Sequence, residues 1–441
     1  MPIPLLAQGI TDGFSSIPYA YPVFKTAAGL ILLTLLKWYF GGSRNSAERL
    51  MRSKVIMVTG GTSGIGAAVV FGLASRGAQI ILLTQHPPSD LFLVDYIQDL
   101  RNSTNNQLIY AEQVDLSSLH SIRQFATKWV DNAPPRRLDM VILCADTFIP
   151  SRSRKLRTVD GLDEEWQVNY LSNFHLLSIL SPALRAQPPD RDIRVIFSTC
   201  SGYIGAWLDL QQTEGAEPFV PAKAMMSKTA TGKMQRPKQP ASKAPVNMYG
   251  MAKLSLMVFA QAFQKHLFSY QRPDKQPMNA RVLIVDPGFS RTPGTRRWLT
   301  GGSLWGLIFY LLTWPLWWLV LKSPQQGAQS FLYAAMDSRF GRGPGGWMIK
   351  ECKEVDFLRK EVRDDKIAKQ LWEFSEQQIQ TKEKEGATKR ALAKKEQGAA
   401  VATASATTTP STQEGTAEPL QLGHTAKTQT PGSRRNRKTK A

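Results

Sequence analysis

The chain has 441 residues, of which 42% are hydrophobic, so it can bury the core of one large domain with appended segments or of two smaller domains. Its formal net charge of +20 at pH 7 is concentrated toward the C-terminus, where residues 382–441 hold more Lys and Arg than Asp and Glu. The three cysteines lie far apart, with no Cys-x-x-Cys pair, which excludes a zinc-finger framework and favours a reducing compartment. The sequence therefore predicts no metal site.

Residues 24–40 form an apolar segment that is interrupted only by Lys25 and Lys37. About 17 residues is the lower limit for a helix that crosses a bilayer. Basic residues follow the apolar run instead of preceding it, which argues against a cleavable signal peptide and keeps the remaining chain on the cytosolic side. We expect an N-terminal segment, residues 1–45, with a membrane anchor at about residues 24–40, which either spans the bilayer or lies in its interface.

From Lys54 onward, short apolar runs alternate with longer amphipathic runs. The apolar runs are rich in Val, Ile and Leu and show little alternation, as in strands that are buried on both faces of a parallel sheet. This rhythm predicts right-handed βαβ crossovers and an α/β fold with a doubly wound parallel sheet, in a domain over residues 46–376. The predicted strands are 54–60, 79–84, 108–115, 138–145, 193–199 and 280–288, and the predicted helices are Ile65–Arg76, Leu119–Asn132, Trp166–Leu180 and Met248–Leu267.

The motif TGGTSGIG at Thr59–Gly66 lies between the first predicted strand and the first predicted helix. In that position the first glycine allows a tight turn, the second lets the backbone approach a pyrophosphate, and the third lets the helix pack against the strand. The helix N-terminus presents free N–H groups and the positive end of its dipole to the phosphates. The motif predicts a dinucleotide site formed by Gly60, Thr62, Ser63, Gly64, Ile65 and Gly66.

The second predicted strand ends in Thr84-Gln85-His86. An acidic residue at this point would bind the ribose 2′-hydroxyl of NAD and repel the 2′-phosphate of NADP. None is present, and no Arg stands there either, so the sequence modestly favours NADP while NAD stays open.

Tyr249 and Lys253 are four residues apart within a predicted helix, so they share one face of it. A nearby ammonium stabilises a phenolate and lowers the pKa of the tyrosine. Such a tyrosine can protonate a carbonyl oxygen as hydride arrives, or deprotonate an alcohol in the reverse reaction. The helix follows an insertion at residues 207–245, which has little periodicity and is predicted to be a mobile loop.

Residues 304–321 are uncharged and contain four tryptophans and Pro315. Their length fits a transmembrane helix, but residues 323–336 and 345–350 behind them look like the last helix and strand of the sheet. A full span would separate those elements from the sheet, so we expect an interfacial or re-entrant segment; a buried core helix is the alternative. Residues 377–441 lack the apolar content to fold alone and predict a disordered basic tail without a nucleic-acid partner.

These motifs together resemble the short-chain dehydrogenase/reductase family and its Rossmann fold from about Lys54 to Lys353. Residues 158–177 and 323–336 resemble the retinol-dehydrogenase-like branch, and membrane-bound oxidoreductases of fungal lipid droplets are similar. The resemblance implies that Tyr249 donates the proton and that Lys253 binds the nicotinamide ribose and lowers the pKa of Tyr249. It also implies a relay water on Asn169, Asp115 and Leu116 beside the adenine, and Pro287, Gly288 and Thr292 over the carboxamide.

The sequence departs from that family in two places. Asp146 stands where the family has a glycine near the cofactor. The position of the catalytic serine falls on Cys200, a weak hydrogen-bond donor, and a shift of one residue would bring Ser201 into place. We predict Ser201 as the catalytic serine, with Cys200 as the alternative.

The sequence as a whole predicts an NAD(P)-dependent oxidoreductase that acts on a lipophilic alcohol or carbonyl, such as a retinoid, a sterol-like or a long-chain compound. Its expected location is the cytosolic face of the endoplasmic reticulum or a lipid droplet. Two alternatives stay open: a cofactor-binding scaffold or sensor with impaired chemistry, which Asp146 and Cys200 favour, and a membrane or nucleic-acid tether that acts through the tail. The sequence predicts no oligomeric state.

Overall fold

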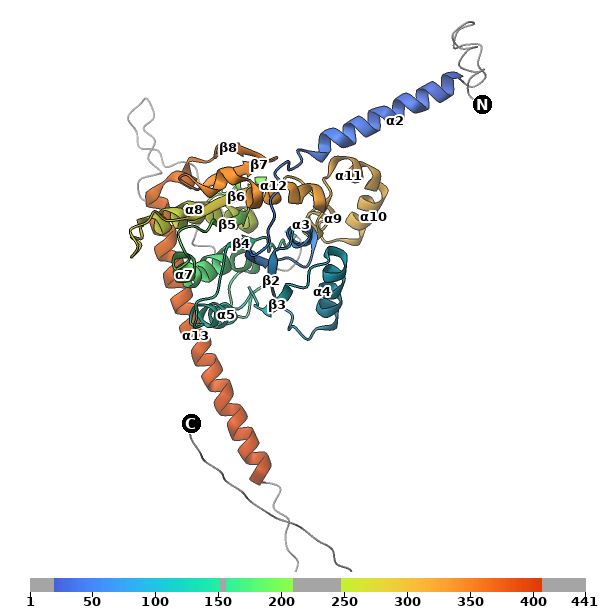
Figure 1. The fold of residues 1–441 in the computed structure, drawn as a ribbon. Helices are drawn as coiled ribbons and strands as arrows, with labels where there is room; N and C mark the ends of the chain where they lie inside the picture. The colour runs from blue at the N-terminus through green and yellow to red at the C-terminus, as the bar shows by residue number, and fades with distance from the viewer. Residues whose placement is uncertain (1–19, 151–155, 209–246, 407–441) are drawn as a thin grey trace, which may run out of the picture. The chain divides into compact units, whose positions relative to one another are not determined.

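The computed structural model describes residues 20–150, 156–208 and 247–406. It contains one eight-stranded sheet in the order β3-β2-β1-β4-β5-β6-β7-β8, in which every neighbouring pair is parallel except β7 and β8 (Figure 1). The predicted doubly wound α/β fold is therefore confirmed. The strands are β1 (Val55–Thr59), β2 (Gln79–Thr84), β3 (Ile109–Gln113), β4 (Met140–Leu143), β5 (Ile193–Ser198), β6 (Ala280–Asp286), β7 (Trp347–Lys350) and β8 (Lys353–Val355).

Helices cover both faces of this sheet because its central strands are apolar on both sides. In β1 every residue is buried: Met57 points into one core, while Ile56 and Val58 point into the other. Residues of α5, α7 and α8 fill the first core, and residues of α3, α4 and α12 fill the second. These helices are α3 (Gly64–Ala74), α4 (Leu91–Thr104), α5 (Leu119–Val130), α7 (Ser172–Arg185), α8 (Met248–Ser269) and α12 (Pro324–Met336).

The helix predicted at Trp166–Leu180 contains a π-helical turn. It begins as α6 (Glu164–Trp166), widens into η2 (Gln167–Leu171) and continues as α7. Such turns are frequent at functional sites. Here the turn contains Asn169, whose side chain is fully buried.

The C-terminal part of the chain differs from the prediction of disorder from residue 377 onward. Helix α13 (Asp365–Ala406) continues through that point. Its early turns are held by tertiary contacts: Ile379 is buried, Gln378 accepts a hydrogen bond of 2.9 Å from Trp166, and Glu383 pairs with Arg123. The chain divides after Ala387 into two compact units, and residues 388–406 belong to the second.

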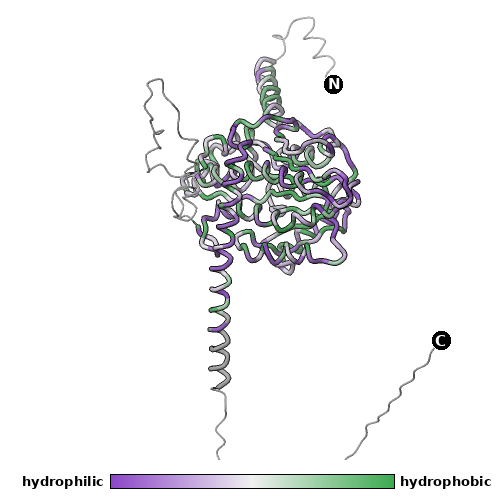
Figure 2. Tube along the Cα trace, turned by 90° about the vertical axis from the view of Figure 1, so that its left-hand side faces the viewer, coloured by the Kyte–Doolittle hydropathy of each residue, from purple (hydrophilic) through white to green (hydrophobic). Residues whose placement is uncertain are grey.

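Helix α2 (Ala20–Gly41) contains the predicted anchor at residues 24–40 (Figures 1 and 2). Within the described residues it is the one helix long and apolar enough to cross a membrane, by length and composition. Its Leu30, Ile31 and Leu32 are exposed. A soluble protein would gain by burying such side chains, so the helix is suited to an apolar environment.

The apolar segment at residues 304–321 forms two short helices, α10 (Leu304–Leu312) and α11 (Trp314–Val320), which follow α9 (Pro293–Thr300). Pro315 lies in the first turn of α11, where its missing N–H costs least. No residue of α10 or α11 is buried, so the alternative of a core helix was wrong.

The residues that flank the segment from α9 to α11 meet beside the sheet. Ser290 and Lys322 form a parallel bridge, in which Arg291 N donates to Lys322 O at 2.8 Å and Lys322 N donates to Phe289 O at 3.0 Å. The chain therefore leaves and returns at one point, as a re-entrant or interfacial segment must. The predicted insertion at residues 207–245 lies outside the described residues, apart from Trp207 and Leu208.

Candidate active site

The sequence-predicted site residues converge at the carboxyl ends of β1, β4 and β5. The glycine turn follows β1, Asp146 follows β4, Cys200 follows β5, and Tyr249 lies in the first turn of α8. In open α/β sheets ligands bind outside this edge, where neighbouring crossovers run to opposite faces of the sheet.

The glycine turn is shaped by two close approaches and by positive φ angles at Gly60 and Gly64. Gly60 has φ of +66°, and a Cβ there would lie 2.7 Å from the Cα of Ala145. A Cβ on Gly66 would lie 2.1 Å from the carbonyl oxygen of Gly60, so the first turn of α3 packs directly against the backbone of the glycine turn. Gly64 has φ of +57°. The roles that the motif predicted for the first and third glycines agree with these contacts.

The N-terminus of α3 fits a pyrophosphate. Its N-cap, Ser63, makes no side-chain capping bond, and both Thr62 and Ser63 are exposed. The first N–H groups of the helix therefore lack this side-chain partner, and the helix dipole favours an anion there. A Cβ on Gly64 would lie 3.6 Å from side-chain atoms of Thr292 and Pro293, so the segment after β6 comes down beside the turn.

Tyr249, Lys253 and Asp146 form one hydrogen-bonded cluster. The Tyr249 hydroxyl donates to Oδ2 of Asp146 at 2.7 Å, and Lys253 Nζ lies 3.1 Å from Oδ1 of the same carboxylate. Lys253 also donates to the carbonyl of Ser198 at 3.4 Å. The Lys253 side chain is only 2% exposed, whereas that of Asp146 is 36% exposed. One carboxylate thus bridges the phenol and the ammonium.

The pKa of Tyr249 is raised, and the prediction that Lys253 would lower it was wrong for this arrangement. Burial raises the pKa of the phenol most, and the charge of Asp146 and the neighbouring thiol of Cys200 raise it further. The main reason is that burial disfavours the charged phenolate, and Asp146, which pairs with Lys253, adds a negative charge beside the phenol.

The side chain of Asn169 hydrogen-bonds to the backbone of Thr147, the residue that follows Asp146. Its Oδ1 accepts from Thr147 N and its Nδ2 donates to Thr147 O, each at 2.8 Å. Its own carbonyl accepts a bond of 3.0 Å from Asn173. These bonds fix the turn that carries Asp146, and the relay water that the resemblance implies on Asn169 stays a prediction.

The thiol of Cys200, and not Ser201, faces the tyrosine, which corrects the predicted catalytic serine. Cys200 Sγ lies 3.5 Å from the Tyr249 hydroxyl. Ser201 begins a short 3-10 turn, and its hydroxyl donates to Asp286 at 3.2 Å and accepts from Lys350 at 3.4 Å. The expected one-residue shift does not occur because this turn directs Ser201 toward β6 and β7.

Other predicted cofactor residues lie at the same edge of the sheet. Asp115 follows β3, and its carboxylate accepts from the amide and the hydroxyl of Ser117, while Leu116 packs against the core. Pro287 and Gly288 follow β6, where Gly288 has φ of +73° and its N–H donates to Asp286 at 2.9 Å. Contact of these residues with a cofactor stays a prediction.

Sequence reasoning missed a contact between α4 and the glycine turn. The hydroxyl of Tyr96 donates to the carbonyl of Gly61 at 2.8 Å, and burial raises the pKa of Tyr96 to about 12. The amphipathic spacing of Leu93, Ile97 and Leu100 could have shown this helix, but nothing in the sequence points its tyrosine at the turn.

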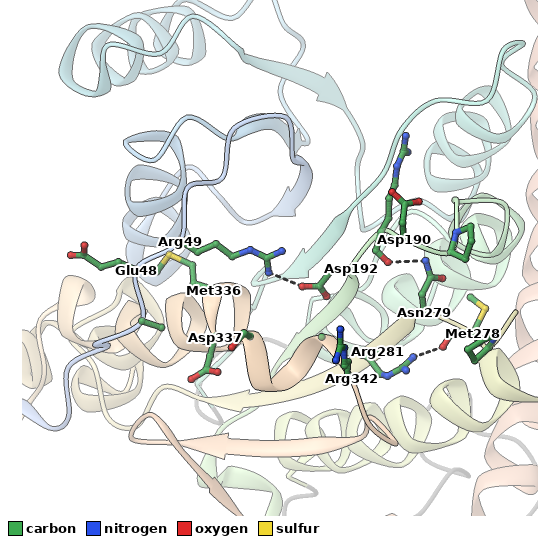
Figure 3. A pocket seen from close by; sticks show the side chains of 16 residues that line it. Glu48, Arg49, Asp190, Asp192, Met278, Asn279, Arg281, Met336, Asp337 and Arg342 are labelled. Atoms are coloured by element: carbon green, nitrogen blue, oxygen red, sulfur yellow. Dashed lines mark hydrogen bonds and ion pairs between the residues drawn. The ribbon is translucent and has the colours of Figure 1, made fainter.

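A separate cavity of about 910 Å³ lies at the opposite ends of the strands (Figure 3). It is lined by residues at the start of β5 and β6, among them Asp192, which precedes β5, and Arg281, the second residue of β6. Arg49, in the segment that follows α2, pairs with Asp192 there at 2.6 Å. The cavity is therefore remote from the glycine turn and belongs to the connection between the N-terminal segment and the sheet.

A family model described as short chain dehydrogenase matches residues 54–202, which hold the glycine turn and Cys200. An uncharacterized oxidoreductase, pbr1, of Schizosaccharomyces pombe is 39% identical over 386 residues, which cover 87% of this chain and 97% of the relative. The chain belongs to the short-chain dehydrogenase family.

Other relatives place this dehydrogenase in the retinol-dehydrogenase-like branch. Retinol dehydrogenase 13 of Mus musculus is 27% identical, with 77% of this chain and 87% of the relative covered. Polyprenol dehydrogenase of Homo sapiens is 25% identical, with 81% and 94% covered. A crystal structure of a putative uncharacterized protein from Mycobacterium paratuberculosis is similar in fold, with a TM-score of 0.50 at 19% identity over 77% of this chain and 98% of that one.

Proposed function

We propose that this protein transfers hydride between a nicotinamide dinucleotide, NADP in preference to NAD, and a lipophilic alcohol or carbonyl. One observation carries the proposal: the turn after β4 touches both halves of the site. Ala145 packs against Gly60 of the phosphate turn, and Asp146 binds Tyr249 and Lys253. This turn would let a dinucleotide bound at Gly64 extend toward the phenol.

The residues divide the work as follows. Backbone groups of Thr62–Ile65 would hold the pyrophosphate at the N-terminus of α3. Lys253 would bind the nicotinamide ribose, and residues from Pro287 to Thr292 would cover the carboxamide. A bound, reduced nicotinamide would supply the hydride. Tyr249 donates its proton to the carbonyl oxygen as negative charge develops on that oxygen during hydride transfer.

The preference for NADP is supported by the end of β2. Thr84 is followed by Gln85 and His86, so no carboxylate directly follows the strand to bind a ribose 2′-hydroxyl.

The lipophilic substrate is supported by the apolar surface beside the site. The segment that covers Gly64 continues through α9 into α10 and α11, where Leu304, Trp305 and Leu312 are more than three-quarters exposed. We infer that α10 and α11 lie in the bilayer interface next to α2, on the cytosolic face of the endoplasmic reticulum or of a lipid droplet. Substrate then reaches the nicotinamide from the lipid. The names of the retinol and polyprenol dehydrogenases point to substrates of this kind.

A second candidate function is a membrane scaffold or sensor that binds the cofactor without efficient turnover. The bridging carboxylate of Asp146 and the weak donor Cys200 favour it, because Asp146 stands where the family has a glycine near the cofactor and Cys200 stands at the position of the catalytic serine.

A substrate screen with a paired variant separates the two candidates. The full chain, extracted in detergent and returned to lipid vesicles, is assayed with NADPH and NADH against retinal, long-chain aldehydes and sterol ketones. Tyr249→Phe is expected to abolish oxidation of NADPH while cofactor binding is retained. Equal, low rates for both proteins would support the scaffold, and reduction of water-soluble carbonyls alone would contradict the lipid substrate.

A further inference from the structure

The carboxylate of Asp146 stands between the two groups that carry the proposed chemistry. It accepts the Tyr249 hydrogen bond at 2.7 Å and pairs with Lys253 at 3.1 Å. An ionised carboxylate only accepts hydrogen bonds, so in this arrangement the phenol must keep its proton. The geometry therefore assigns a protonation state to Tyr249.

The charge balance of the cluster leads to the same state. A buried ammonium is costly unless an anion is close to it. Asp146 supplies that anion for Lys253, so the cluster of carboxylate, ammonium and neutral phenol carries no net charge. With a glycine at residue 146, the Lys253 charge would instead stabilise a phenolate.

Three titratable groups face Tyr249 among the described residues: Asp146 after β4, Cys200 after β5, and Lys253 on its own helix. Burial raises the pKa of the Cys200 thiol, so this neighbour stays uncharged near neutrality. The ring of Phe148 closes the remaining side at a centroid distance of 5.3 Å. Asp146 is thus the neighbour whose negative charge opposes ionisation of the phenol.

We propose that Asp146 is a positioning residue that keeps the Tyr249 hydroxyl protonated and hydrogen-bonded, so that the site remains a proton donor through neutral and alkaline pH. This inference rests on the proposed function for its substrate, a carbonyl compound. In that reduction the carbonyl carbon accepts hydride from the reduced nicotinamide, which is oxidised, and the carbonyl oxygen accepts the Tyr249 proton. The phenolate then regains a proton from water, which reaches the cluster at the exposed side of Asp146.

The turn that carries Asp146 is built to hold this position. Asn169 binds both backbone groups of Thr147, and Glu164 lies 3.3 Å from the Thr147 hydroxyl. Glu164 therefore offers a matched control. Its carboxylate is hydrogen-bonded to the same turn, but among the described residues it is not a partner of Tyr249. Its replacement removes one negative charge and leaves the bridge intact.

The test is a pH titration of the phenol in the cofactor-free, full-length chain. Tyrosinate absorbance is recorded for the wild type, Asp146→Asn and Glu164→Gln, and each curve is corrected with the matching Tyr249→Phe protein. We expect Asp146→Asn to lower the pH at which Tyr249 ionises by about one to three pH units. Glu164→Gln should leave it unchanged. No shift in Asp146→Asn, or an equal shift in both variants, would overturn the proposal.

A kinetic measurement tests the same point through turnover. The alkaline fall of kcat/KM for carbonyl reduction should occur at lower pH in Asp146→Asn than in the wild type. Asp146→Gly, which restores the residue typical of the family, serves if the asparagine variant does not fold, and it should move the profile in the same direction. Because the absorbance titration needs no substrate, a shift without any carbonyl reduction would contradict the proposed function and leave the role of Asp146 standing.

Discussion

Lys37 of α2 caps the end of α11 at Trp318. Its ammonium donates to the carbonyl of Trp318 and, at 3.3 Å, to that of Leu321, and it lies 4.8 Å from the centre of the Trp318 ring. The last carbonyls of a helix have no partner within the helix, and a cation there is stabilising. Lys37 thus joins the apolar helix α2 and helix α11 into one packed unit.

Replacing Lys37 should loosen this unit without unfolding the sheet. We expect Lys37→Met to cost about 1 kcal/mol locally, because the carbonyls at the end of α11 lose their donor. Amide hydrogen exchange in α11 should then rise about fivefold. Lys25→Met is the control, since among the described residues Lys25 contacts the ring of Tyr21 in its own helix. Equal exchange in both variants would show that the cap does not hold the segment.

The glycine turn gives a second prediction. Gly60→Ala would force a side chain into a left-handed conformation and within 2.7 Å of the Ala145 backbone. The conformation alone costs about 1–2 kcal/mol, and the clash displaces the turn that carries Asp146. We expect binding of NADPH, followed by protein fluorescence, to weaken at least about tenfold.

Gly205→Ala is the matched control for that variant. Gly205 has no atom within 4 Å of an added Cβ, so its replacement should change stability by less than about 0.5 kcal/mol and leave NADPH binding intact. Normal affinity in Gly60→Ala would contradict the assignment of this turn as the phosphate site.

The sequence was sufficient for the parallel strands of the sheet and for the elements that carry the site, but it did not predict the antiparallel edge strand β8. Buried apolar runs gave β1 to β6 because strands covered on both faces read as continuous Val, Ile and Leu, and the spacing of Tyr249 and Lys253 placed them on one helical face. The sequence did not predict which side chains the turns after β4 and β5 direct toward Tyr249. Whether Cys200 or Ser201 faces the tyrosine depends on a 3-10 turn after β5, and the bridge made by Asp146 depends on the Thr147 turn. Neither contact follows from a local pattern.

Because Cys200 faces Tyr249 and Ser201 does not, substitutions at these two positions should have different effects on the rate of carbonyl reduction. Cys200→Ser replaces a weak thiol donor by a hydroxyl beside Tyr249, so carbonyl reduction should become faster, by about two- to tenfold for one better hydrogen bond. Ser201→Ala should leave the rate nearly unchanged, because its hydroxyl serves Asp286 and Lys350. Steady-state kcat/KM for one carbonyl substrate decides between them. A large loss in Ser201→Ala alone would restore Ser201 as the residue that orients the carbonyl.

The contact between α13 and the sheet domain should make stability depend on pH in acid. Burial would raise the pKa of Glu383, but hydrogen bonds and charges from His175 and Arg123 outweigh it and lower the pKa to about 2. A carboxylate with a lowered pKa in the folded state stabilises the fold at neutral pH. That stabilisation is lost as the pH falls from the ordinary value near 4.5 toward 2.

Glu383→Gln should therefore remove part of the acid sensitivity. We expect the variant to be less stable than the wild type at pH 7 and the difference to shrink below pH 4.5, when the wild-type carboxylate also becomes protonated. Denaturant unfolding at several pH values measures this difference. Glu385→Gln is the control, since the partner of Glu385 is Lys382 within the same helix. A pH-independent difference between Glu383→Gln and the wild type would mean that other contacts, such as those of Ile379 and Gln378, hold α13, and not this ion pair.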